Sequence, residues 1–179
     1  MNTIQPDYFV GDGRLQLNEA GQRFNELKAH VERETAQFER SWAGAFLASI
    51  FLAEPWLAAF DLVITTSHEY DDQGGTYLCF SSSMTAVQVV DGVPLPDTVQ
   101  GDDGGFDVDL AADYLAEQFD TCERCMFAVF RDDEVETMKI EVRREPIASL
   151  LAAGPVSGIE AFRALFPDEA SPADAPPAR

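Results

Sequence analysis

Basic side chains are what this sequence most lacks. Lys and Arg number 12 against 32 Asp and Glu, which gives a formal net charge of −20. No Lys or Arg occurs between residues 41 and 123, a stretch that holds 15 of the acids. Such a balance disfavours contact with the phosphates of nucleic acids and with anionic membrane surfaces. We therefore expect no nucleic acid and no membrane among the partners of this chain.

Long apolar runs are missing as well. Residues 42–53 are a stretch of twelve residues without a charge, whereas a membrane-spanning helix needs about 20 apolar residues. This stretch predicts a buried core helix. The opening residues, MNTIQPDYFV, have neither the basic start nor the apolar run of a signal peptide, so we expect a cytoplasmic protein. Abundant Ala, and ten Arg against two Lys, indicate a GC-rich bacterial source.

Residue types that build catalytic and metal sites are scarce. There are three cysteines and two histidines. Cys122 and Cys125 form a C-x-x-C pair, which could be a redox motif or half of a zinc site. A thioredoxin-like pair follows a parallel strand and opens a helix, whereas this one is predicted to follow a helix and enter a strand. We expect reduced, structural cysteines and no cofactor, although metal binding at Cys122 and Cys125 stays open.

The spacing of apolar residues predicts helices and hairpin-linked strands. Apolar residues three and four apart predict an amphipathic helix over residues 24–42, after an N-cap at Asn18, and Asp107 is expected to cap a second helix. Shorter helices are expected over 146–153 and 157–166. Alternation and turn residues predict a hairpin around residues 11–13 and strands over 62–67, 76–82, 84–90, 126–130 and 136–142.

These elements predict an α+β fold with a single domain over residues 1–166. Hairpin-linked strands favour an antiparallel sheet of about five strands, in the order α-βββ-α-ββ-α, packed with helices. The tail over residues 167–179 is rich in Pro, Ala and Asp, a composition typical of disorder.

A row of acids on the second predicted helix is the feature that most suggests binding. Its members are spaced by about one turn on the face opposite the predicted buried residues: Asp109, Asp113, Glu117 and Asp120. Like charges four residues apart destabilise a helix by about 0.2–0.5 kcal/mol per pair, and a soluble helix needs no such row. A basic partner would gain from it through steering and charge-assisted contacts. The tip of the first long hairpin adds three more acids: Glu69, Asp71 and Asp72.

Four functional readings follow from these patterns. The first is a non-enzymatic protein that neutralises or masks a basic protein, with the physical character of an immunity protein or toxin inhibitor. The second treats the acids as a solubilising surface only. In the third, the predicted element order, the small size and the acidity resemble the chaperones of type III secreted effectors; this resemblance implies binding of an extended effector segment and a homodimer. The fourth is an enzyme that uses His68 and Glu69.

Overall fold

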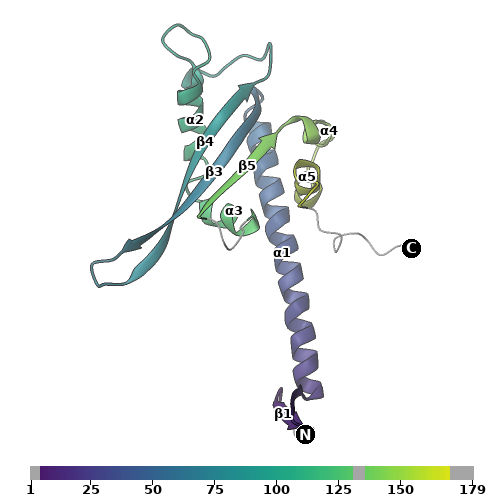
Figure 1. Ribbon diagram of the computed structural model, residues 1–179. Coiled ribbons are helices and arrows are strands. Elements are labelled where there is room, and N and C mark those ends of the chain that lie inside the picture. The colour runs from purple at the N-terminus through teal and green to yellow at the C-terminus, as the bar shows by residue number, and fades with distance from the viewer. Residues whose placement is uncertain (1–4, 131–135, 170–179) are drawn as a thin grey trace. The chain divides into compact units, whose positions relative to one another are not determined.

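The computed structural model describes residues 5–130 and 136–169 (Figure 1). The described residues form two compact units, the first ending at Phe38 and the second beginning at Glu39. Helices combine with antiparallel sheets of two and three strands, so the predicted α+β class is confirmed. The sequence predicted one domain over residues 1–166 and no division at residue 38. Most of the predicted disordered tail, residues 170–179, lies outside the described residues.

The first unit opens with the predicted hairpin. Strands β1 (Tyr8–Gly11) and β2 (Arg14–Leu17) pair antiparallel around Asp12 and Gly13. Both turn residues have positive φ, 53° and 73°, as a two-residue hairpin turn that follows the strand twist requires.

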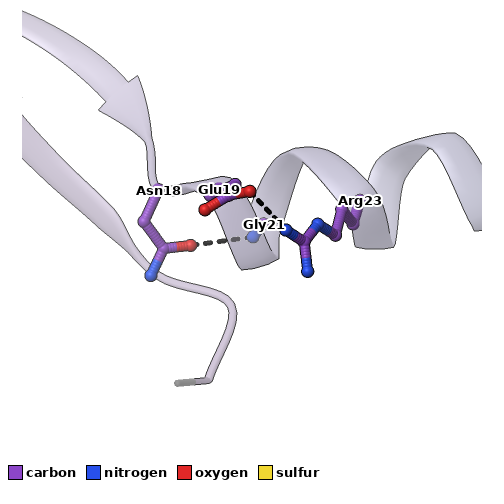
Figure 2. A network of polar contacts seen from close by, with 4 residues as sticks. All are labelled: Asn18, Glu19, Gly21 and Arg23. Carbon is purple, nitrogen blue, oxygen red and sulfur yellow. Dashed lines mark hydrogen bonds and ion pairs between the residues drawn. The ribbon is translucent and has the colours of Figure 1, made fainter. Parts of the chain in front are cut away.

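Asn18 then caps helix α1 (Glu19–Ala53), as predicted. Its side-chain Oδ1 accepts a hydrogen bond of 2.7 Å from the backbone N–H of Gly21, and Arg23 forms an ion pair with Glu19 one turn away (Figure 2). The cap satisfies one of the backbone donors that a helix leaves open at its start. The predicted amphipathic and uncharged segments both belong to this one helix.

The second unit is built on a three-stranded sheet in the order β4-β3-β5. Strand β3 (Leu57–Tyr70) is central and pairs antiparallel with β4 (Thr76–Val89) and with β5 (Thr137–Arg143). The ring of Phe119 packs against Phe46 of α1 and Phe60 of β3, with centroids 5.1 and 6.1 Å away. The core therefore lies where the second half of α1, the sheet and the chain after α2 meet.

One predicted strand boundary is wrong. The sequence predicted two strands over 76–82 and 84–90, but β4 is a single strand. The strand continues through Ser83, which pairs in regular register with Val63. A bulge lies further along β4, where Ala86 has φ 52° and the pairing with β3 shifts between Asp61 and Ala59. An extra residue of this kind bends a strand without ending it.

The predicted strand over 126–130 is also wrong, because these residues belong to helix α3 (Glu123–Phe130). Met126 and Phe127 are buried, and the ring of Phe130 lies 5.6 Å from that of Phe162 and 4.8 Å from that of Phe166. A short apolar run cannot be told from a buried helix by its spacing alone. Strand β5 pairs with β3 rather than with 126–130. The sequence also predicts a hairpin turn over residues 131–134, and this turn lies outside the described residues.

The remaining helices complete the second unit. Helix α2 (Val108–Glu117) follows a loop that contains a 3-10 turn at Asp97–Val99. After β5 the chain forms a second 3-10 turn at Glu145–Ile147. The two predicted helices follow it, as α4 (Ala148–Ala153) and α5 (Gly158–Leu165). Helix α5 approaches α1 so closely that a Cβ on Gly44 would lie 2.1 Å from the carbonyl oxygen of Gly158. Among the described residues, no helix has the length and apolar character needed to cross a membrane.

Candidate functional site

Helix α2 carries three of the seven acids that the sequence singled out, and its start is well defined. The Oδ1 atom of Asp107 accepts hydrogen bonds of 3.0 Å from the backbone N–H groups of Asp109 and Leu110, so the predicted cap is confirmed. Ala111 and Leu115 are buried, as is Phe119 just beyond the helix. Val108, which was predicted to share this buried face, is instead 46% exposed.

The opposite face of α2 is acidic and open to solvent. Asp109, Asp113 and Glu117 are all exposed, spaced one turn apart. Asp120 is exposed too, but it lies in the turn that follows the helix rather than on the helix itself. We call the three helical residues together with Asp120 the acidic face of α2.

A buried carboxylate fixes α2 against the rest of its unit. Glu54, only 8% exposed, accepts a hydrogen bond of 2.7 Å from the hydroxyl of Tyr114 and another of 2.6 Å from Nε1 of Trp56. The hydrogen bond to Glu54, with burial and the negative charge, raises the pKa of Tyr114 above its ordinary value. Because Tyr114 is on α2, this contact sets how the helix and its acidic face are presented.

Glu54 is a residue whose role the sequence reading missed. It was counted only as one acid among many. The signal that could have found it is its isolation, because it is the one charged residue between 42 and 60. A lone charge in an apolar stretch is buried only when partners satisfy it, so donors for Glu54 could have been expected.

Arg144, which follows β5, links the end of α1 to the start of β3 near Glu54. Its guanidinium donates to the backbone oxygens of Phe51, Glu54 and Leu57, the last two at 2.7 Å. It also lies 5.2 Å from the centre of the Phe51 ring. These carbonyls sit at the end of α1 and the start of β3, so Arg144 neutralises the open carbonyl end of α1. Burial lowers the pKa of Arg144.

The acids of the hairpin tip lie apart from α2. Figure 1 shows the turn between β3 and β4 at the far end of a long two-stranded arm, with α2 beside the other end of β4. Asp71 shapes this turn, since its Oδ1 accepts from the backbone N–H groups of Gln73 and Gly75 at 2.9 and 2.6 Å. Glu69 accepts a bond of 3.2 Å from the hydroxyl of Tyr77, which raises the pKa of Tyr77. Asp72 is exposed. The structure therefore holds two separate acidic groups.

The candidate catalytic pair stands on this same arm. His68 is exposed and opposite Leu78 in the strand register, while the carboxylate of the neighbouring Glu69 is engaged by Tyr77. His68 is paired with an apolar residue, and the thiol that interacts with Glu69, that of Cys79, has its pKa raised by burial and by this carboxylate. The arrangement adds nothing that favours an enzyme.

The C-x-x-C pair opens a helix, so the expectation that it enters a strand is wrong. Cys122 precedes α3 and Cys125 lies in its first turn. A redox pair needs a thiol whose pKa is lowered, yet burial raises the pKa of Cys122 to about 11. Cys122 is buried and donates to the carbonyl of Phe119, whereas Cys125 is exposed. Within the described part of the chain, no group of three or more His, Cys, Asp and Glu side chains is placed to hold a metal ion.

The chain matches no protein-family model, and neither curated proteins nor solved structures show a significant match to it.

Proposed function

We propose that this protein is a non-enzymatic binding protein whose acidic face of α2 docks against a basic protein and neutralises or masks it, in the manner of an immunity protein or inhibitor. The observation that carries the proposal is the exposure of Asp109, Asp113 and Glu117 along one face of a helix whose other face is buried. We place this activity in the cytoplasm, as the sequence predicts.

The geometry supports a structured docking site rather than a diffuse charge. Residues four apart on a helix are separated by about 6 Å along its axis, so the acids form a row of fixed spacing. The buried side of α2 and the Tyr114–Glu54 contact hold that row in place. Groups that are already ordered lose less entropy on binding. Arg or Lys side chains on a partner would also relieve the repulsion within the row.

Two double variants with the same change in charge test the proposal. Asp113→Lys with Glu117→Lys alters the acidic face of α2, and Glu69→Lys with Asp72→Lys alters the hairpin tip. Tagged wild type and both variants would be incubated with nuclease-treated lysate of the source cell, washed at rising salt, and analysed by mass spectrometry. We expect wild type and the tip variant to retain the same basic protein, which salt releases, and the α2 variant to lose it.

Association kinetics with that protein then give the decisive comparison. Charge reversal on α2 should slow association at least tenfold and flatten its salt dependence, while reversal at the tip should change the rate much less. Equal slowing by both variants would assign the effect to net charge alone. Binding that is indifferent to salt and to both variants would overturn the proposal.

The structure supports the two alternative functions less than it supports the acidic docking site. The resemblance to type III chaperones depended on the order α-βββ-α-ββ-α. Among the described residues, β3 and β4 are the only strands between α1 and α2, and residues 126–130 are helical. The enzyme reading depended on His68 and Glu69, which stand on the exposed arm.

A further inference from the structure

The first unit has no core of its own. Among its described residues, 5–38, only Gly21 is buried. Eight large apolar side chains are instead exposed by about half or more: Tyr8, Phe9, Val10, Leu15, Phe24, Leu27, Val31 and Phe38. The sequence predicted an amphipathic helix here, and the apolar face of that helix is uncovered.

The exposed residues of α1 follow the spacing of a helix–helix seam. Phe24, Val31 and Phe38 recur every seven residues, and Leu27 lies between the first two. In heptad notation, Phe24, Val31 and Phe38 occupy successive a positions. Leu27 occupies the first d position and Glu34 the next. Such a stripe is the narrow face that packs against one other helix. We call Phe24, Leu27, Val31 and Phe38 the apolar stripe of α1.

The hairpin extends this surface. Tyr8 and Leu17 of the hairpin and Phe24 of the stripe line the same hollow. An isolated two-stranded hairpin is marginally stable in water, and helices in proteins draw most of their stability from packing. The hairpin and the first half of α1 would therefore both be more stable if another surface covered them.

The charges beside the stripe favour a partner like itself. Residues 19–38 contain four acids and three bases, and several of these pair one turn apart within the helix. Arg23 pairs with Glu19, and Lys28 pairs with Glu32 at 3.7 Å. This segment is nearly neutral in a chain of net charge −20, so two copies of it can approach without the repulsion that the remainder would impose.

The exposed area is of the size that a dimer needs. At about 200 Å² per aromatic side chain, the exposed fractions of Tyr8, Phe24 and Phe38 present about 400 Å². Val10, Leu15, Leu27 and Val31 add to it. A standard protein interface buries about 800 Å² on each partner.

We propose that a second copy of this chain covers the apolar stripe of α1 and the adjoining hairpin, forming a homodimer through the first unit. A two-fold interface uses the same patch on both subunits and must be self-complementary. An apolar stripe flanked by balanced, internally paired charges meets that condition. This proposal is independent of the acidic face of α2, which belongs to the second unit.

Sedimentation equilibrium of the full chain and three variants tests the proposal. Val31→Glu places a charge in the stripe. Ala29→Glu is the matched control, because it adds the same charge nearly opposite Val31 on the helix. Glu34→Leu replaces the polar d position with an apolar residue. We expect wild type and Ala29→Glu to sediment as dimers of the 19.7 kDa chain. Val31→Glu should dimerise at least tenfold more weakly, and Glu34→Leu at least tenfold more tightly.

Three results would overturn the proposal. One is a wild-type chain that stays monomeric over the accessible concentration range, since the stripe would then await a different protein. Another is equal weakening by Val31→Glu and Ala29→Glu. The third is a wild-type dimer that neither Val31→Glu nor Glu34→Leu alters, because its interface would then lie elsewhere. The double variant Asp113→Lys with Glu117→Lys should remain dimeric, which separates this test from that of the proposed function.

Discussion

At the scale of single residues, Arg144 does the most to join distant parts of the second unit. It donates to three backbone carbonyls that precede it by 87 to 93 positions. Removing its guanidinium takes a charged donor from each of these oxygens, although that of Glu54 keeps the backbone N–H of Leu57. Hydrogen bonds to charged groups are worth about 1.5–3 kcal/mol each. Its neighbour Arg143 is exposed and forms an ion pair with Glu141, which is exposed as well.

Arg144→Met should therefore lower the free energy of unfolding by about 2–4 kcal/mol, as measured by urea denaturation. Arg143→Met should change it by less than about 1 kcal/mol, because exposed ion pairs contribute little. Similar losses in both variants would show that the carbonyl contacts of Arg144 are not what stabilises this corner.

Cysteine reactivity should separate the two thiols of the C-x-x-C pair. An ordinary thiol has a pKa near 8.5, and burial raises that of Cys122 to about 11. At about pH 8 the reactive thiolate of Cys122 is then scarcer by about two orders of magnitude. Iodoacetamide should alkylate Cys125 at least tenfold faster than Cys122 in the folded protein, as followed by mass spectrometry. In denaturant the two rates should converge, and equal rates in the folded state would contradict the burial of Cys122.

Sequence reasoning at this scale succeeds where the partner is near along the chain. The caps at Asn18 and Asp107 involve residues two or three positions away, so local residue types are enough to predict them. The contact between Tyr114 and Glu54 spans 60 positions. Such a pair depends on the fold itself, and no local pattern encodes it.

At the scale of elements, the crossing of α1 and α5 depends on two glycines. A Cβ on Gly44 would lie 2.1 Å from the carbonyl oxygen of Gly158, and a Cβ on Gly158 would lie 2.0 Å from that of Ser41. Both neighbours are backbone atoms and cannot move aside as a side chain can. The two helices can pack at this distance only without side chains at the crossing.

Gly44→Ala should consequently destabilise the protein by about 2–4 kcal/mol. In an exposed helix the same change is stabilising by about 1 kcal/mol, so the sign distinguishes the two situations. Urea denaturation measures the change. A neutral or stabilising effect would mean that α5 does not approach α1 so closely.

Elements were predicted well where their signals are long or punctuated. The hairpin of β1 and β2, the start of α2 and the last two helices follow from turn and cap residues. Helix α3 was mistaken for a strand because eight residues give too few periods to decide. The uncovered stripe of α1 shows another limit, because apolar spacing predicts a buried face without saying what buries it.

At the scale of the whole molecule, charge is distributed unevenly. Residues 39–179 carry 26 acids and 8 bases, while residues 1–38 carry six acids and four bases. Repulsion among the acids opposes the compact state, and salt weakens it as the Debye length falls from about 30 Å at 0.01 M to about 3 Å at 1 M.

The melting temperature should therefore rise by several degrees over this range of NaCl, at about 2–4 °C for each kcal/mol gained. The double variant Asp113→Lys with Glu117→Lys has a charge four units less negative, so its increase should be smaller. Calorimetry measures both. A melting temperature that is flat or falls with salt would show that the acids are far enough apart not to oppose folding.

The unequal pairing of β3 along its length has a consequence for how the molecule opens. Up to Thr66 the strand is bonded on both sides, to β4 and to the chain at β5, whereas from Ser67 to Tyr70 the described residues pair it with β4 only. Amide hydrogens should therefore exchange with deuterium in a gradient along one strand, slowest near Leu62 and fastest near the tip. A protease should therefore cut between Asp71 and Gly75 at the tip, because the strands can separate there while the core stays folded.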